Sequence, residues 1–304
     1  MARTWSHVSA KKPQYTQRKS SPGSCPKPAD RHVEGAVEMM LDATRNYNQP
    51  MTSERLFAWH AALFLIGRSG MSKIRTDSWR DDSGGPMQVV SGPMGKEHVH
   101  FEAPKANRLD REMKLFLDWF EGDKTTDPIL HAGLAHLWFV TIHPFDDGNG
   151  RIARAIADTA LARSENSAQR FYSMSSQIRQ ERNEYYSVLE RTQKGTIEVT
   201  LWMEWFLGCL GRAIDGSQMI LSAVLEKARF WDRIQNVHLN DRQRMTVNRL
   251  LDGFEGKLTT SKYAALAKCS QDTAHRDIVA LIERGVLVRN PEGGRSTSYS
   301  LKRE

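Results

Sequence analysis

Two apolar segments on either side of a short polar loop constrain the fold of this chain more than any other feature. The segments "PILHAGLAHLWFVTI" and "RIARAIADTALARS" cover residues 128–142 and 151–164, and the loop "HPFDDGNG" lies between them. Pro144 cannot continue the first helix, and the glycines of the loop are typical of a turn. We therefore predict two helices joined at residues 143–150 in a mainly α protein.

Helical periodicity also extends over residues 33–47 and 53–67. In the first segment Val33, Val37 and Leu41 share one face, and the second segment follows Thr52, a good N-cap. His60 lies on the apolar face of the second helix, where we predict a hydrogen-bonded core residue and not a ligand. Further helices are predicted at residues 107–122, 173–192 and 196–213.

A β-hairpin is predicted between these helices. Gly and Pro become frequent after Gly67, and two short extended runs, "PMQVV" and "EHVHFEAP", are joined by "SGPMGK". An isolated pair of strands is marginally stable, so this hairpin, residues 85–104, must pack on the helical body or receive a partner strand.

The segment 215–304 has a different organisation. A long amphipathic segment is followed by three shorter helical segments and then by "NPEGG", a hairpin turn between two extended runs. Three helices followed by a hairpin is the winged helix-turn-helix arrangement. We predict an irregular arm at residues 1–32, a helical domain at 33–214, and a linker helix with a winged helix-turn-helix domain at 215–304.

Composition excludes several classes of protein. The three cysteines, Cys25, Cys209 and Cys269, are far apart, so neither a disulfide framework nor a zinc site is indicated. No run approaches the roughly 20 apolar residues that span a bilayer, and the N-terminus lacks the apolar region of a secretory signal. We predict a soluble, cytoplasmic protein with no membrane partner. The net charge of +7 permits an acidic partner without identifying one.

The loop at residues 143–150 has the chemistry of an anion site. It enters a helix N-terminus, where unpaired backbone N–H groups and the positive end of the helix dipole favour phosphate. Gly148 and Gly150 allow the backbone to approach a phosphate closely and to adopt positive φ. Arg151 and Arg154, one turn apart, add charge-assisted donors.

Two further side chains indicate a reaction at this loop. Asp147 is a carboxylate beside a phosphate site, which is how proteins hold Mg²⁺ together with a nucleotide. His143, just before the loop, can take a proton from an attacking hydroxyl. A base, a metal ligand and an anion site together predict phosphoryl or nucleotidyl transfer.

The string "HPFDDGNGRIAR" matches every fixed position of the Fic motif, H-P-F-x-[DE]-G-N-G-R-x-x-R. The chain therefore resembles the Fic family, and with its C-terminal segment it resembles the multidomain bacterial type, over residues 33 to 304. This resemblance implies a helical Fic core in which the hairpin is a flap that clamps a target segment by strand addition. The implied docking residues of the flap are Val89, Val90, His98, Val99 and His100.

Fic enzymes transfer AMP from ATP to a hydroxyl of a target protein and release pyrophosphate. By resemblance, His143 is the catalytic base, Asp147 binds Mg²⁺, and Phe145 anchors the loop in the core. The phosphotransferase branch typically carries Lys in place of Gly150, so AMP transfer is favoured. The implied nucleotide-binding residues are Asp147, Gly148, Asn149, Gly150, Arg151 and Arg154, with Tyr185 and Tyr186, near Asn183, at the adenine.

The chain departs from the family at its inhibitory segment. Many Fic proteins carry [ST]-x-x-x-E-[GN], whose Glu pairs with the second Arg of the motif; here the nearest match is "DRHVEG", with Asp30 in place of Ser or Thr. Glu34 is thus a candidate inhibitory residue, although it also suits the start of the next helix. We expect weak or absent internal inhibition, with self-modification, and a separate inhibitory protein is the alternative. A homodimer is a further candidate assembly.

The C-terminal domain offers a candidate nucleic-acid interface. In a winged helix the third helix enters the major groove, which makes Gln271, Thr273, His275 and Arg276 candidate DNA-binding residues, with Arg289 and Arg295 at the wing. Such domains also serve as protein-packing units. Two alternatives to protein AMP transfer stay open: a nucleotide-sensing, DNA-binding transcriptional regulator, and a Fic enzyme that uses another nucleotide.

Overall fold

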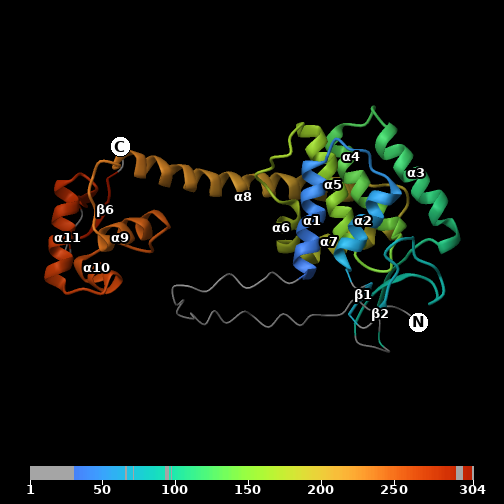
Figure 1. Ribbon diagram of the computed structural model, residues 1–304, viewed down its shortest axis with the longest axis horizontal. Coiled ribbons are helices and arrows are strands. Elements are labelled where there is room, and N and C mark those ends of the chain that lie inside the picture. The colour runs from blue at the N-terminus through green and yellow to red at the C-terminus, as the bar shows by residue number, and fades with distance from the viewer. Residues whose placement is uncertain are drawn as a thin grey trace. The chain divides into compact units, whose positions relative to one another are not determined.

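The computed structural model describes residues 31–65, 67–70, 72–92, 96, 98–291 and 297–302, so most of the predicted arm and Cys25 lie outside the described residues. The described chain divides into two compact units, with the division between Ser217 and Gln218. Both units are mainly helical (Figure 1), as predicted. No helix of the described chain has the length and apolar character needed to cross a bilayer.

The first unit is a helical bundle with two short strand pairs. Its helices are α1 (Arg31–Arg45), α2 (Ser53–Leu63), α3 (Leu109–Gly122), α4 (Pro128–Ile142), α5 (Asn149–Glu165), α6 (Met174–Gln180), α7 (Arg182–Lys194) and the first part of α8 (Thr200–Arg233), with a 3₁₀ turn, η1 (Ala106–Arg108), before α3. The strands are β1 (Arg68–Ser69), β2 (Ser72–Lys73), β3 (Gln88–Ser91) and β4 (His98–Glu102).

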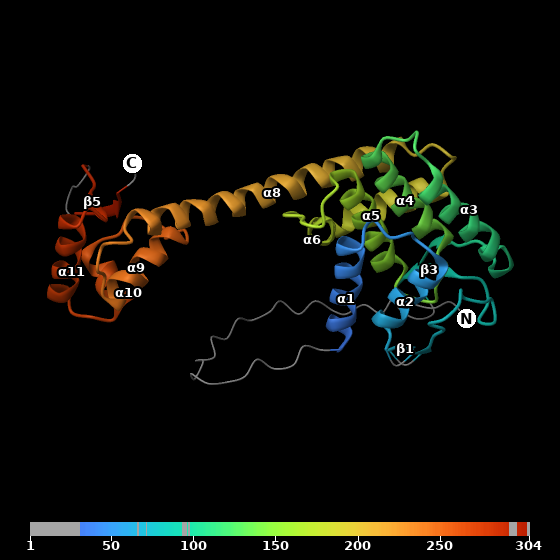
Figure 2. The ribbon, with the colours of Figure 1, turned by 45° about the horizontal axis from the view of Figure 1, so that its top comes forward.

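Helices α4 and α5 form the centre of this bundle. Helix α5 packs against α4, α1, α2 and α6 (Figures 1 and 2), and most of its side chains from Ile152 to Ala162 are buried. Helix α4 begins at Pro128, where Asp127 caps the first turn through its side chain. The loop that joins α4 to α5 is therefore held at both ends by the best-packed helices of the unit.

Two helix predictions were wrong in detail. The segment 173–192 is two helices that meet at Glu181. The break predicted near residue 214 is absent, since α8 continues from Thr200 to Arg233. Gly211 and Gly216 lie inside α8, and a helical glycine costs only about 1 kcal/mol, whereas a proline would have ended the helix.

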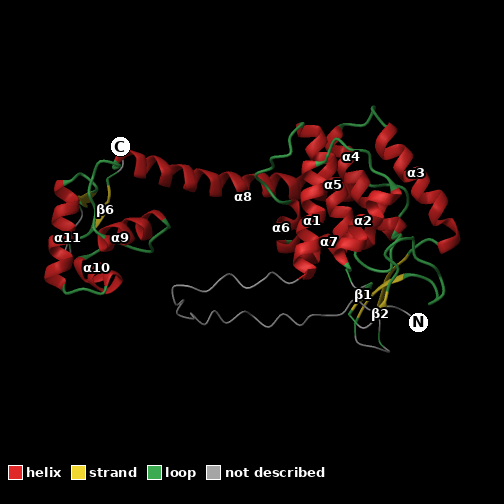
Figure 3. Ribbon diagram, in the orientation of Figure 1, coloured by secondary structure: helices red, strands yellow, loops and turns green. Residues whose placement is uncertain are grey.

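The predicted hairpin is present as β3 paired with β4 in antiparallel register, with an irregularity between Val89 and Val90, and its role as a flap stays a prediction. The strands of the first unit lie together at one end of the bundle (Figure 3). Val90 is 1% exposed, so its side chain anchors the flap and cannot contact a docked target segment. The pair β1–β2, with two residues per strand, was not predicted because so short a pair has no readable alternation.

The second unit contains α9 (Asp241–Leu251), α10 (Thr260–Ala267) and α11 (Gln271–Glu283), followed by β5 (Leu287–Arg289) and β6 (Tyr299–Leu301). The strands pair antiparallel, and a further bridge joins Leu258 to Tyr299. Ser270 caps α11 as predicted. Val247, Tyr263 and Ile278 are fully buried members of its core.

Candidate active site

His143 lies at the end of α4, where its backbone turns into the left-handed region with φ 52°. Its side chain is buried, and its Nδ1 is 3.1 Å from the carbonyl oxygen of Val140. Because a carbonyl only accepts, Nδ1 carries the proton in this contact and Nε2 keeps a lone pair. Burial lowers the pKa of His143 to about 4; the positive charge of Arg80 acts in the same direction, and the Val140 carbonyl and Asp147 oppose it. The ring is therefore a neutral base at physiological pH.

Arg80 holds the backbone of this turn in place. Its side chain is fully buried; Nε donates to the His143 carbonyl at 2.8 Å and an Nη group donates to the Pro104 carbonyl at 2.5 Å. The backbone N–H of Arg80 also donates to the Pro144 carbonyl at 2.9 Å, and Asp82 accepts from its remaining Nη at 3.1 Å. The Arg80 guanidinium thus links the backbone of His143 to Pro104, the last residue of the flap segment.

The loop after His143 is fixed by Phe145 and Asn149. The Phe145 ring is fully buried and stacks on His60, with ring centroids 4.2 Å apart. The Asn149 amide accepts from the Phe145 N–H at 3.0 Å and donates to the Phe145 carbonyl at 2.8 Å. The Asn149 side chain therefore shapes the loop, so any contact of Asn149 with phosphate would come from its backbone N–H. His60 is the hydrogen-bonded core residue predicted, with Nε2 3.1 Å from the Asp147 carbonyl.

Gly148 is required by the loop geometry. It adopts φ +82°, and a Cβ there would lie 3.0 Å from the Phe64 ring. Gly150 has no positive φ and lines a cavity, so its bare backbone allows close approach of a ligand. In the described chain, the N–H groups of Asn149 and Gly150 have no carbonyl partner outside α5. These donors lie at the N-terminus of α5, where the anion site is predicted.

Asp147 fits a divalent cation at this site. Its Oδ1 accepts from the Gly148 N–H at 2.6 Å, and its Oδ2 accepts from the Ser69 hydroxyl. A carboxylate has about four lone-pair positions, so each oxygen can still coordinate an ion while these two bonds orient it. One oriented carboxylate beside phosphate donors is the arrangement that binds Mg²⁺ with a nucleotide.

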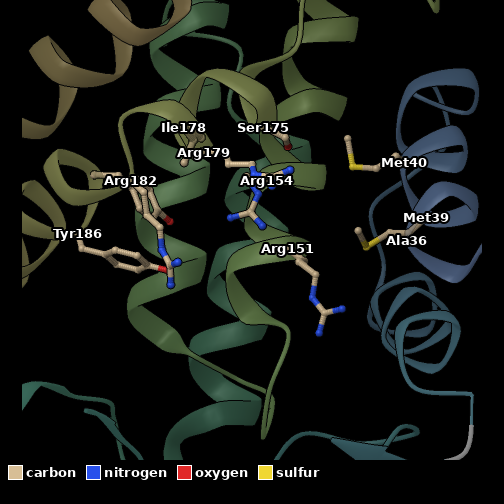
Figure 4. A pocket seen from close by; sticks show the side chains of 11 residues that line it. Ala36, Met39, Met40, Arg151, Arg154, Ser175, Ile178, Arg179, Arg182 and Tyr186 are labelled. Atoms are coloured by element: carbon tan, nitrogen blue, oxygen red, sulfur yellow. The ribbon is translucent and has the colours of Figure 1, made fainter. Parts of the chain in front are cut away.

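A cavity of about 450 Å³ opens beside the anion site and is strongly basic. Figure 4 shows Arg151 and Arg154 of α5 between Met39 and Met40 of α1 on one side and Arg182 of α7 on the other. No carboxylate from the described part of the chain lines it. Its remaining walls come from α1, α6 and α7: Ala36, Ser175, Ile178, Arg179, Tyr185 and Tyr186.

A second cavity, of about 380 Å³, contains the base. His143 and Gly150 line it, and it shares four residues with the basic cavity: Arg154, Arg182, Tyr185 and Tyr186. The flap and α7 supply its apolar and polar walls, including Val89, Phe101, Asn183, Leu189 and Gln193. The two cavities are therefore adjacent, with Arg154 and Arg182 in the walls of both.

Tyr185 and Tyr186 differ in exposure. Tyr185 is buried, with its hydroxyl 3.0 Å from His136 Nε2, and burial raises its pKa. Tyr186 is half-buried beneath the Arg182 guanidinium, 5.5 Å from the ring centroid. Both tyrosines thus line both cavities, and Tyr186 is the more exposed of the two.

The other predicted site residues are dispersed. On the flap, Val89 and His100 line the second cavity, whereas His98 and Val99 are exposed. Glu34 lies in the first turn of α1 and is exposed; it is two positions from Ala36, hence on the opposite side of the helix from the basic cavity. The described residues contain no ion pair between Glu34 and Arg154. This geometry gives the inhibitory prediction no support.

On α11, Gln271, His275 and Arg276 are exposed, while Thr273 is partly covered by its hydrogen bond with Ser270. Arg289 is exposed and donates to Thr297 at 3.3 Å, and Arg295 lies outside the described residues. DNA binding by this unit stays a prediction.

Sequence reasoning missed Arg80, Arg179, Arg182 and Ser69. The arginines of α6 and α7 occur in "QIRQERNEYY", where two basic residues one turn apart precede the tyrosines, a signal that was readable. Arg80 lies in a loop and Ser69 in the two-residue strand β1, and no sequence pattern distinguishes either from solvent-exposed residues.

Comparison with known proteins shows similarity to the Fic/DOC family. The sequence profile of the Fic/DOC family matches residues 50–161. The protein adenylyltransferase Fic of Nematostella vectensis is 32% identical over 114 residues, 37% of this chain and 25% of that protein. The corresponding protein of Drosophila yakuba is 33% identical over 105 residues, 34% of this chain and 20% of that protein. This chain therefore spans about a quarter or less of the length of these curated relatives.

A similar fold occurs in a solved structure. The crystal structure of a Fic family protein from Desulfovibrio desulfuricans G20 aligns with a TM-score of 0.50 and 22% identity, covering 89% of this chain and 74% of that one. At this identity the likeness concerns the fold alone.

Proposed function

Because residues 50–161 form a Fic/DOC family domain, we propose that this chain is a protein adenylyltransferase, which transfers AMP from ATP to a hydroxyl side chain of a target protein. The observation that carries the proposal is that the neutral base His143 lines one cavity and an adjacent cavity, which shares Arg154 and Arg182 with it, is lined by four arginines. No carboxylate of the described residues lines that adjacent cavity. A base beside an anion receptor suits transfer from a polyphosphate to an alcohol.

The basic cavity would hold the phosphates of ATP. Arg151 and Arg154 stand one turn apart on α5, at the end where the N–H groups of Asn149 and Gly150 lie, which have no carbonyl partner outside α5 among the described residues. Arg179 and Arg182 face the same space from α6 and α7. Four guanidinium groups in a partly buried cavity repel one another, and an anion removes that repulsion while it accepts their hydrogen bonds.

In the proposed transfer step, the unprotonated Nε2 of His143 acts as the base. The target hydroxyl gives its proton to Nε2 while its oxygen attacks the α-phosphorus; the bond from that phosphorus to the bridging oxygen breaks, and pyrophosphate leaves. Nδ1–H keeps its bond to the Val140 carbonyl, which orients the ring and stabilises the imidazolium as it forms.

We assign Asp147 as the protein ligand of Mg²⁺. Ser69 and the Gly148 N–H hold its carboxylate in one orientation. When bound, the ion would neutralise negative charge on the phosphates.

The proposal is tested by measuring which phosphate of ATP is transferred to protein. The full chain is incubated with a cell lysate, Mg²⁺ and ATP labelled on either the α- or the γ-phosphate. Relative to the lysate alone, we expect additional protein-bound label from α-labelled ATP and release of pyrophosphate, with no additional label from γ-labelled ATP. An increase in γ-label when the chain is added would assign a kinase reaction, and no increase from either nucleotide would refute transferase activity.

The pKa of His143 predicts an unusual pH dependence. Burial lowers the pKa of His143 to about 4. The ring therefore stays mostly neutral until the pH approaches this value. Between pH 7.5 and 5.5 the neutral fraction then stays above about 90%, whereas an ordinary histidine with a pKa of about 6.5 would lose about tenfold. We expect kcat/KM for ATP, measured with excess Mg²⁺, to change less than about twofold over this range. A tenfold fall, with the far-UV circular dichroism unchanged, would contradict the assignment.

DNA binding is a second candidate function, for the second unit alone. Exposed Gln271, His275 and Arg276 on the first two turns of α11 favour it. Exposed Asp272 on the same helix weakens the positive potential there. A separate inhibitory protein, a homodimer and a cytoplasmic location stay predictions.

A further inference from the structure

A second hydrogen-bonded histidine lies in the wall of the catalytic cavity. His100, on β4 of the flap, has its Nδ1 2.5 Å from Glu190 Oε2 of α7. Its other nitrogen, Nε2, is 2.6 Å from Ser91 Oγ on β3. Ser91, His100 and Glu190 all line the cavity that contains His143.

The carboxylate decides which nitrogen of His100 carries the proton. An ionised carboxylate can only accept, so Nδ1 donates to Glu190, and in the neutral ring Nε2 accepts from the Ser91 hydroxyl. The other oxygen of Glu190 accepts from Lys194 at 2.6 Å, and this bond, followed by the one from His100, lowers the pKa of Glu190. Glu190 therefore stays ionised at neutral pH.

This order of contacts, hydroxyl to imidazole to carboxylate, is the one that activates nucleophilic hydroxyl groups in enzymes. A flap that served target docking alone would need backbone edges and apolar pockets, and it would not require a hydroxyl aimed at a polarised imidazole. The three side chains come from both flap strands and from α7, so the flap must sit on α7 for the arrangement to exist.

We propose that Ser91 is a self-modification site, an acceptor hydroxyl that His100 and Glu190 activate towards ATP bound in the same cavity. The inference rests on the proposed function. Ser91 Oγ forms a bond to the α-phosphorus, the bond from that phosphorus to the bridging oxygen breaks, and pyrophosphate leaves. The proton of Ser91 passes to His100 Nε2, and Glu190 stabilises the imidazolium through Nδ1–H. The product is an AMP phosphodiester on the flap.

Such a product would limit the reaction. The attached AMP would occupy the cavity that contains His143 and Gly150, so a modified chain could not bind a second ATP there. Self-modification should therefore release about one pyrophosphate per chain and then stop, because each chain carries one Ser91.

The experiment follows AMP on individual peptides. The full chain is incubated with ATP and Mg²⁺, digested and examined by mass spectrometry, and pyrophosphate is measured in parallel. We expect AMP on the peptide that contains Ser91, and none on that peptide in Ser91→Ala. His100→Gln and Glu190→Gln should slow modification of Ser91 by about 10²-fold, the usual effect of losing a general base. Ser83→Ala is the matched control, since Ser83 is an exposed serine of the loop before the flap that bonds to Asp81.

The outcomes separate this inference from the proposed function. AMP on other hydroxyls, with Ser91 unmodified, would overturn the inference and leave transferase activity standing. Modification of Ser91 at an unchanged rate in Glu190→Gln would show that His100 and Glu190 do not activate it, which also overturns the inference. Absence of AMP from every peptide and from lysate proteins, with no pyrophosphate, would refute the proposed function itself.

Discussion

Replacing His143 with alanine is expected to lower the rate of AMP transfer by about 10²- to 10⁴-fold, the usual contribution of a general base. In the proposed mechanism the imidazole Nε2 accepts the proton of the attacking hydroxyl, and alanine offers no acceptor at that position. The proposed phosphate site lies elsewhere, at the arginines of the basic cavity and the N-terminus of α5. The affinity for ATP, measured by isothermal titration calorimetry, should therefore change little.

His131→Ala provides the matched control. His131 is also a histidine of α4 whose pKa is lowered by burial, and its ring stacks on Trp119 at 4.2 Å. It lies twelve residues before His143, about 18 Å along the helix. Its loss should reduce stability and leave the transfer rate of the folded chain unchanged. Equal losses of rate in His131→Ala and His143→Ala would mean that stability, and not base catalysis, explains the effect.

The parts of the site that were predictable lie next to one another in the chain. His143, Asp147 and Gly148 fall within six residues, and a helix N-terminus forces such neighbours together whatever the rest of the fold does. The flap was predictable for a similar reason, because alternation within each strand and the turn between them are local features.

The parts that were missed depend on contacts between distant segments. Arg80 reaches the His143 carbonyl across 63 positions and Pro104 across 24, and a lone arginine in an aperiodic loop has no pattern that indicates burial. The pairing of His100 with Glu190 joins a strand to a helix 90 positions away. Periodicity assigns each element a face, but it does not specify which side chains of two packed faces meet.

Glu34 shows that a correctly predicted position on a helix does not establish a function. Its motif placed it at a helix start, and the structure has it in the first turn of α1. An inhibitory role also requires the carboxylate to face Arg154, and Ala36 and Met40 occupy that side of α1. A sequence motif reports spacing along a helix, whereas inhibition depends on how the helix is rotated against its neighbour.

Arg80→Met should reduce both stability and catalysis, and the two effects can be separated. Methionine fills much of the space but removes every side-chain donor, which leaves the carbonyls of His143 and Pro104 without partners; each unsatisfied buried group costs about 1–3 kcal/mol. Free energies of unfolding from urea denaturation will measure this loss. Arg75→Met is the control, because Arg75 is exposed and pairs with Asp81 at the surface, a contact worth at most about 1 kcal/mol.

The catalytic effect of Arg80→Met is expected in kcat and not in KM for ATP. Without the bond to its carbonyl, the left-handed turn at His143 can relax, and a shift of the base by about 1 Å costs about 10²-fold in rate. Rates are compared at a temperature where near-UV circular dichroism shows the variant folded. Arg80→Lys keeps the charge, but its donors all lie on one nitrogen and cannot reproduce the separate contacts of Nε and the two Nη groups, so it should resemble Arg80→Met. Full activity in Arg80→Lys would mean that the charge near His143 matters and the position of its backbone does not.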